Sequence, residues 1–379
     1  MVDPAGFSTL TANLGIKDDT TDLLLVSCDL PTSTAGVFTR SRFAGPSVEL
    51  SRSVAMSGQS RGLVVVSKNA NVANGEQGRS DAAELQALTA THLGAPAGAI
   101  AVASTGVIGR PYPMDRVRSG FAELGVPTTA DFEAAAQAIM TTDTKPKLVR
   151  AAVGDGSIVG IAKGVGMIEP DMATLLTFFF TDVGTTDLDA VLRSVCESTF
   201  NALSIDTDTS TSDTAMVFAN TSAGVAPSDE FASALHQVAL GLVRMIAADG
   251  EGATKVIEAT VTGARDAAQA RRVAKSIVNS PLVKTAVHGS DPNWGRIAMA
   301  VGKCHDCDDV DAERVRIRIG ETAMYPPAAG LTALATAAAY MRGATTIMAV
   351  DLGVAGGTFT AYGCDLTDGY VRINADYTT

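Results

Sequence analysis

The segment KGVGMIEPDMATLLTFFF, residues 163–180, places one threonine where it could act as a nucleophile. Glycines and Pro170 precede Thr174 and an apolar run follows it, so this threonine stands at the entry of an expected strand. A threonine hydroxyl needs a base, and the α-amine of the same residue can serve once the chain is cut before it. Such an amine has a pKa of about 8 and is partly neutral at neutral pH. If the bond between Ala173 and Thr174 were cut, Thr174 would supply both nucleophile and base.

The cut itself would use the same hydroxyl against the preceding carbonyl, and it requires a nearby group that stabilises the oxyanion. The segment STGVIGRPYPM is a candidate, because Ser104, Thr105 and Gly106 directly follow a buried-looking strand. Glycine there would let backbone N–H groups point at a ligand. From these residues alone, an ordinary strand-to-loop turn is the preferred interpretation.

Two further polar segments keep alternative interpretations. Residues 204–214 of SIDTDTSTSDTA hold four threonines, three serines and three aspartates, a density that satisfies neighbouring backbone groups or forms a helix-capping loop. HGSDPNWGR combines His288 with Asp291, a pattern compatible with acid–base chemistry. For the second segment, a structural turn with a hydrogen-bonded histidine is the preferred interpretation.

The composition excludes several classes of protein. In 379 residues, 29 Lys and Arg oppose 41 Asp and Glu, and the net charge of -12 argues against a surface that binds nucleic acid. The N-terminal MVDPAGFSTL lacks a signal-peptide pattern, and we expect no apolar run near the roughly 18 residues of a membrane span. We expect a soluble cytoplasmic protein without nucleic-acid or membrane partners.

The cysteines predict reduced thiols and no metal site. Their number is odd and their spacing scattered, unlike the paired framework of a small secreted domain. Cys304 and Cys307 have C-x-x-C spacing in KCHDCDD, but no second pair follows to complete a zinc site. The remaining three are Cys28, Cys196 and Cys364.

Expected strands and helices interleave along the chain. β-branched runs at 61–72 and 99–109 predict strands, whereas 80–95, 129–142, 188–203 and 229–250 have helical spacing with Ser, Thr or Asp near most starts. The last third continues with strands at 255–264 and 313–320 and a helix at 266–280, and residues 357–374 are expected to form sheet. This alternation predicts an α/β protein.

The chain resembles the glutamate N-acetyltransferase family, also called ornithine acetyltransferases, which are self-cleaving N-terminal-threonine enzymes. The resemblance spans nearly the whole chain in family order. It rests on STGVIG, AIMTTDTKPK, KGVGMIEPDMATLLTF, SIDTDTSTSDTA, DGEGATK, NSPLVKTAVHGSDPNWGR and GYVRINADYTT. The spellings FTRSRFAGPSV and MIEPDMAT are most similar to the paralogue of clavam-type antibiotic gene clusters.

This resemblance implies a fold, a cleavage and a set of site residues. It implies layered sheets with flanking helices, of the N-terminal-nucleophile aminopeptidase type, and an α chain of residues 1–173 intertwined with a β chain of residues 174–379 in one catalytic unit. Thr174 would be the nucleophile, with Thr105 and Gly106 as the oxyanion pair, which reverses the preference for an ordinary turn. Substrate contacts would come from Thr142, Lys163, Thr174, Glu251, Asn374 and Thr379.

The implied reaction moves the acetyl group of N-acetylornithine to glutamate by ping-pong transfer, without metal or cofactor, in an α2β2 or larger assembly. A lysine can pair with a substrate carboxylate and a glutamate with an ammonium. The terminal carboxylate of Thr379 could also receive the substrate's amine. Two alternatives stay open: an enzyme that also uses acetyl-CoA as donor, and an amidase or peptidase with water as acceptor.

Overall fold

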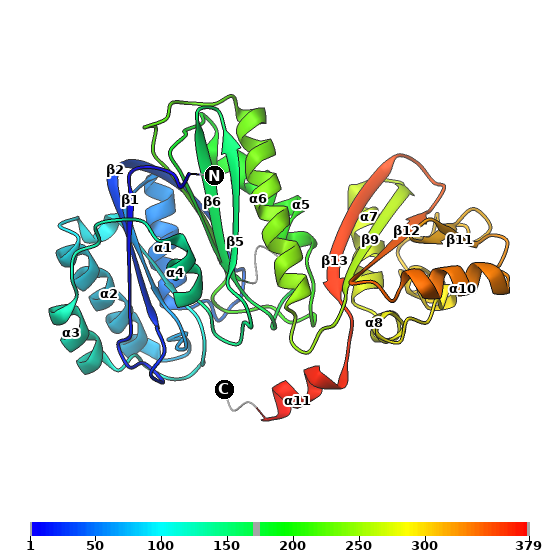
Figure 1. Ribbon diagram of the computed structural model, residues 1–379, viewed down its shortest axis with the longest axis horizontal. Coiled ribbons are helices and arrows are strands. Elements are labelled where there is room, and N and C mark those ends of the chain that lie inside the picture. The colour runs from blue at the N-terminus through cyan, green and yellow to red at the C-terminus, as the bar shows by residue number, and fades with distance from the viewer. Residues whose placement is uncertain (1, 170–174, 377–379) are drawn as a thin grey trace.

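The computed structural model describes residues 2–169 and 175–376, which form two β-sheets with helices packed on them (Figure 1). The first sheet has eight strands in the order β4-β3-β2-β8-β7-β6-β5, with β1 paired to β2. Its strands are β1 (Phe7–Ala12), β2 (Leu23–Phe38), β3 (Gln59–Val66), β4 (Ile100–Ser104), β5 (Lys147–Val153), β6 (Gly156–Lys163), β7 (Leu176–Thr181) and β8 (Thr214–Ala219).

Strand β7 shows how the apolar run of the opening segment is used. Its phenylalanines alternate between faces, as the two-residue period of a strand requires. Phe180 packs 5.1 Å from Phe132 of α4, whereas Phe179 lies 6.1 Å from Phe200 on the side of α5 and α6. The helices of this part are α1 (Pro46–Ser57), α2 (Gly75–His92), α3 (Met114–Glu123), α4 (Phe132–Ala138), α5 (Leu188–Ser198) and α6 (Ser228–Ala248).

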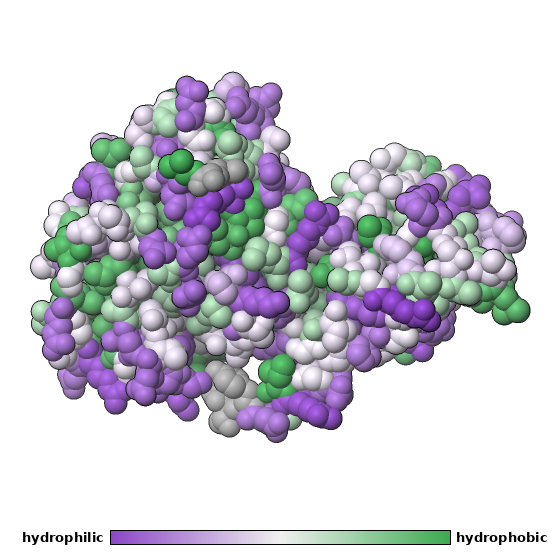
Figure 2. Space-filling view, in the orientation of Figure 1, coloured by the Kyte–Doolittle hydropathy of each residue, from purple (hydrophilic) through white to green (hydrophobic). Residues whose placement is uncertain are grey.

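The second sheet has five strands in the order β11-β10-β12-β9-β13 and forms a separate lobe with its own apolar core. Its strands are β9 (Val256–Ala264), β10 (Arg316–Ile319), β11 (Thr322–Tyr325), β12 (Thr345–Asp351) and β13 (Gly357–Cys364). The helices are α7 (Ala267–Val278), α8 (Pro281–His288), α9 (Trp294–Gly302), α10 (Leu331–Tyr340) and α11 (Asp368–Asp376). Figure 2 shows a notch between the two lobes, with hydrophilic and apolar residues interspersed over this face.

The layered α/β architecture predicted from the sequence is confirmed. Strands from both sides of the 173/174 junction share the first sheet, because β6 pairs antiparallel with β7 and Lys163 is opposite Leu176. The last residues of β6 and the first residues of β7 therefore lie at one edge of the sheet, on either side of the chain's proposed cleavage point.

The expectation of sheet throughout residues 357–374 is wrong for its second half. Strand β13 ends at Cys364, and a helix begins at Asp368. The hydroxyl of Thr367 accepts a hydrogen bond from Gly369 N at 3.0 Å, which satisfies a backbone donor at the helix start. Helix α11 runs away from the second sheet and lies beneath the first lobe (Figure 1). Asn374 of this helix donates to Glu251.

Helix α6 bears on the expectation that no apolar run approaches the length of a membrane span. It has 21 residues and, among the described residues, it alone is long and apolar enough by length and composition to cross a membrane. Its apolar side chains are core residues here: Phe231, Leu235, Val238 and Leu242 are fully buried in the cluster that covers the first sheet. A long core helix that packs on a sheet can have the same apolar content as a helix that spans a membrane.

Candidate active site

A cavity of about 150 Å³ opens beside the end of β6 and the start of β7 and gathers polar groups from distant parts of the chain. All the described site residues of the sequence prediction line it: Thr105, Gly106, Thr142, Lys163, Glu251 and Asn374. Ala173, Thr174 and Thr379 lie outside the described residues. Leu175, which follows the predicted nucleophile, lines the same cavity.

Lys163 stands at the last position of β6 and points to the oxyanion candidate. Its Nζ donates to Thr105 Oγ1 at 3.1 Å. An ammonium has donors only, so Thr105 Oγ1 accepts this bond and its own proton is directed elsewhere. The Thr105 N–H donates to Val66 O at 3.0 Å and is therefore committed to the sheet edge. Thr105 can thus serve an oxyanion through its hydroxyl and not through its backbone.

Gly106 has to be a glycine because two backbone segments meet there. Its φ is +127°, and an added Cβ would lie 2.2 Å from the carbonyl carbon of Lys68. This close approach seats the 105–107 loop on residues 68–70 and leaves the Gly106 backbone on the cavity wall. The sequence expectation that backbone N–H groups here point at a ligand is wrong for Thr105, whose N–H donates to Val66 O.

Glu251 holds together the opposite wall of the cavity. Its Oε2 accepts from Asn374 Nδ2 at 2.8 Å, and its Oε1 accepts from Thr142 Oγ1 at 3.4 Å. Gly166 lies under the carboxylate, where an added Cβ would meet Glu251 Oε2 at 2.5 Å. Both of these side-chain donors are neutral, and a carboxylate held in this way is suited to bind an ammonium group.

Buried charges lie behind Lys163. Asp143 accepts from Gly164 N and from Lys147 Nζ, both at 2.7 Å, and Lys147 Nζ also lies 2.6 Å from Asp249 Oδ2. Burial would raise the pKa of Asp143, but the ammonium groups of Lys163 and Lys147 hold it below its ordinary value. Burial lowers the pKa of Lys163, and the charge of Asp143 opposes that shift. Asp143 was not among the residues predicted from the sequence, although its four-residue spacing from Lys147 in TTDTKPK indicates an ion pair.

The polar segment at 204–214 forms hydrogen bonds with the chain on both sides of residues 170–174. Asp206 accepts from Met167 N at 2.6 Å and from Ile168 N at 2.8 Å. Thr214 N donates to Leu175 O at 2.9 Å beyond the junction. Met167 and Thr207 both have positive φ, 55° and 71°, a strained region for residues with side chains. The segment therefore positions the backbone that leads into and out of the predicted cleavage site.

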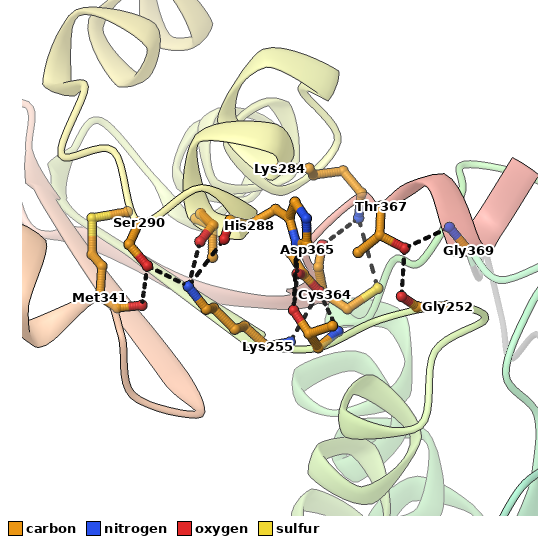
Figure 3. A network of polar contacts seen from close by, with 12 residues as sticks. Gly252, Lys255, Lys284, His288, Ser290, Met341, Cys364, Asp365, Thr367 and Gly369 are labelled. Carbon is orange, nitrogen blue, oxygen red and sulfur yellow. Dashed lines mark hydrogen bonds and ion pairs between the residues drawn. The ribbon is translucent and has the colours of Figure 1, made fainter.

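The HGSDPNWGR segment lies outside this cavity and forms a structural turn. His288 Nδ1 lies 3.1 Å from Asp365 Oδ2, and Lys255 Nζ binds the turn through Val287 O at 2.9 Å and Ser290 Oγ at 2.6 Å (Figure 3). Trp294 stacks on Tyr325 with ring centroids 5.1 Å apart. Of the two interpretations left open for this segment, the geometry supports the structural turn.

The cysteines agree with their prediction as free thiols. All five are unpaired to one another, and no group of three or more His, Cys, Asp or Glu among the described residues could hold a metal. Cys304 and Cys307 form a turn in which Cys307 N donates to Cys304 O at 2.9 Å.

Comparison with known proteins places the chain in a family. The model of the ArgJ family matches residues 8–379. Glutamate N-acetyltransferase Oat2 from Streptomyces clavuligerus is 56% identical, over 99% of this chain and 98% of the relative. Arginine biosynthesis bifunctional protein ArgJ 2 from a Nostoc species is 53% identical, over 99% and 98% of the two chains. A crystal structure of the arginine biosynthesis bifunctional protein from Bacillus halodurans is 38% identical, with a TM-score of 0.49 over 53% of this chain and 98% of that one. The chain therefore belongs to the ArgJ family of acyltransferases.

Proposed function

We propose that the protein is an ornithine acetyltransferase, which moves the acetyl group of N2-acetylornithine to glutamate through an acetyl-Thr174 intermediate. The observation that carries the proposal is one cavity that joins Thr105 and Lys163 to Glu251 and is lined by Leu175, the neighbour of Thr174. The names of the relatives, which include a glutamate N-acetyltransferase, support the same reaction.

Self-cleavage between Ala173 and Thr174 precedes catalysis in this proposal. The Thr174 hydroxyl attacks the Ala173 carbonyl, and the peptide C–N bond breaks to give an ester and the free Thr174 amine. Water then hydrolyses the ester, which releases the Ala173 carboxylate and restores the Thr174 hydroxyl. The anchoring of Met167 and Ile168 by Asp206 supports this step, because it fixes the backbone just before the junction. The products are chains of 1–173 and 174–379, which stay together because β6 and β7 pair in one sheet.

Acetyl transfer then takes two half-reactions. The Thr174 hydroxyl attacks the acetyl carbonyl while its amine takes the proton, and ornithine leaves with that proton. Glutamate's amine next attacks the ester, Thr174 regains its hydroxyl proton, and N-acetylglutamate departs. In both, the Thr105 hydroxyl and the Gly106 N–H stabilise the oxyanion.

Charged groups on opposite walls would orient the amino acids. Lys163 donates one of its three N–H bonds to Thr105 and retains donors for a substrate's α-carboxylate. Glu251 would bind an ammonium, with Thr142 and Asn374 holding its carboxylate in place. Thr379 is proposed as a further substrate contact.

Initial-rate kinetics combined with mass measurement test the reaction. Parallel lines for varied acetylornithine and glutamate, with one added acetyl group on the 174–379 chain, are the expected results. Intersecting lines without acetyl-enzyme would contradict the proposal. Equal rates of acetylornithine breakdown with and without glutamate would instead identify a hydrolase.

The names of several relatives, which are called bifunctional, favour a second acetyl donor besides N2-acetylornithine. In this candidate function the enzyme also accepts acetyl-CoA and acetylates glutamate directly. Release of free thiol from acetyl-CoA that depends on glutamate would establish it, and no release would restrict the enzyme to acetylornithine.

The cellular location, the assembly and the pathway of the enzyme are also proposed from its family. We propose a cytoplasmic α2β2 assembly, which light scattering of the purified protein tests. The 56% identity to a Streptomyces clavuligerus relative supports the resemblance to the clavam-cluster paralogue, so the product would serve arginine supply or that specialised pathway.

A further inference from the structure

A second cavity of about 160 Å³ borders the first, and Glu251 lines both. It lies between the two lobes, where α8, the end of β13 and the start of α11 come together. Its lining residues are Ile205, Asp206, Thr207, Glu251, Asn279, Pro281, Lys284, Cys364, Asp365, Leu366 and Tyr370.

Lys284 brings a buried positive charge to this second cavity. The residue is 5% exposed, and its Nζ donates to Cys364 O at 2.5 Å and lies 3.9 Å from Cys364 Sγ (Figure 3). Within residues 2–169 and 175–376, no carboxylate lies within 4.0 Å of this ammonium. A buried ammonium without a counter-charge is costly, so the site favours an anionic ligand.

The carboxylates that share the cavity are already held by other donors. Asp365 accepts from Thr254 N at 2.7 Å, from Lys255 N at 2.9 Å and from the Thr254 hydroxyl at 2.5 Å. Asp206 is occupied by the backbone ahead of the junction. Among the described residues these two carboxylates are therefore engaged elsewhere, which leaves Lys284 able to pair with an anionic group of a bound molecule.

The two amino acids of the proposed reaction supply such a molecule and explain the mixed charges. Both react through the nitrogen on Cα, and a ping-pong enzyme admits them to one site in turn. Their side chains then point in the same direction but end in opposite charges: an ammonium in ornithine and a carboxylate in glutamate. A shared side-chain subsite needs one group of each sign.

Resting on the proposed function, we propose that the second cavity is this shared side-chain subsite. Lys284 binds the γ-carboxylate of glutamate, and Glu251, at the boundary between the cavities, binds the δ-ammonium of N-acetylornithine. The side-chain carboxylate selected in the second half-reaction is thus recognised by a residue of α8 that the first cavity does not contain.

The substitution Lys284→Met tests this assignment because it removes the charge and keeps most of the side chain. The acetyl-enzyme is formed first with N-acetylornithine, and its breakdown is then followed with glutamate or with glutamine, which lacks the negative charge. We expect kcat/KM for glutamate to fall about 10- to 100-fold, as for loss of one charge-assisted hydrogen bond. The rate with glutamine should change far less, so the glutamate preference collapses.

Lys275→Met is the matched control. Lys275 is also a buried lysine that donates to a backbone carbonyl, Leu203 O at 2.6 Å, but it lines neither cavity. The control should keep the wild-type preference for glutamate over glutamine. An unchanged preference in Lys284→Met would overturn the subsite while leaving acetyl transfer intact. Equal use of both acceptors by the wild type would overturn it without any variant, and a wild type that forms no acetyl-enzyme would refute the proposed function itself.

Discussion

Lys163 Nζ donates to Thr105 Oγ1 over 3.1 Å, and this contact determines what the threonine hydroxyl can do. Because the lysine occupies one lone pair, the hydroxyl proton is available to a developing oxyanion. Lys163 thus acts on the reaction in two ways: it directs the hydroxyl proton of Thr105 toward the oxyanion, and its own positive charge lies close to the reacting group.

Replacing Thr105 with valine should remove the hydroxyl donor while keeping the side chain's shape. We expect about a 100- to 1000-fold slower release of ornithine in the first half-reaction, and slower self-cleavage for the same reason. Thr105→Ser retains the hydroxyl and serves as the control. Rapid-quench measurement of ornithine release gives the rates, and a wild-type rate in Thr105→Val would remove Thr105 from the oxyanion site.

The charge of Lys163 predicts a pH dependence. Burial lowers the pKa of Lys163 from its ordinary 10.5, and Asp143 raises it, so activity that needs the ammonium is lost as pH rises through this lowered pKa. Asp143→Asn removes the opposing charge and should move the alkaline limb of the first half-reaction to lower pH. Asp249→Asn, which takes a carboxylate from Lys147 instead, is the control. An alkaline limb that stays in place in Asp143→Asn would contradict this role of Asp143.

The anchoring of residues 167 and 168 predicts an effect on self-cleavage. Asp206→Asn leaves one acceptor for two backbone N–H groups, so the chain ahead of the junction should be held less firmly. We expect self-cleavage to slow roughly 10-fold, as for loss of about one charge-assisted hydrogen bond. Denaturing gels over time measure it. Asp208 contacts Glu169 N through its backbone carbonyl, so Asp208→Asn should cleave at the wild-type rate; equal rates in both variants would contradict the prediction.

Two glycines that follow β4 should respond differently to alanine. At Gly106, an added Cβ meets the Lys68 backbone, whereas at Gly109 it meets nothing within 4 Å although φ is +81°. Gly109→Ala should therefore cost only the conformational penalty, about 1–2 kcal/mol in free energy of unfolding. Gly106→Ala should cost more and also slow acetyl-enzyme formation. Denaturant unfolding compares the two, and equal losses would show that the close approach at Gly106 is relaxed without cost.

The sequence predicted the local parts of the site better than its assembly. Thr174 could be singled out because glycines, a proline and an apolar strand lie within a few residues of it. Glu251 and Asn374 are 123 residues apart, and no spacing rule brings such residues together, so only the family resemblance placed them in one site.

The errors have physical reasons as well. Residues 368–374 contain the aromatic and β-branched residues typical of strands, but after β13 they leave the sheet and find no strand to pair with. Asp206 was one of several similar side chains in 204–214, and its function depends on backbone donors about 40 residues away. The amino-acid composition of residues 204–214 does not indicate hydrogen-bond partners that lie so far away in the sequence.

The most direct test of the whole account is the intact mass of the purified protein under denaturing conditions. Self-cleavage by Thr174 predicts two polypeptides, residues 1–173 and 174–379, and a single uncut chain for Thr174→Ala. A wild-type protein that remains one chain of 38.8 kDa would contradict it, and so would two polypeptides from Thr174→Ala.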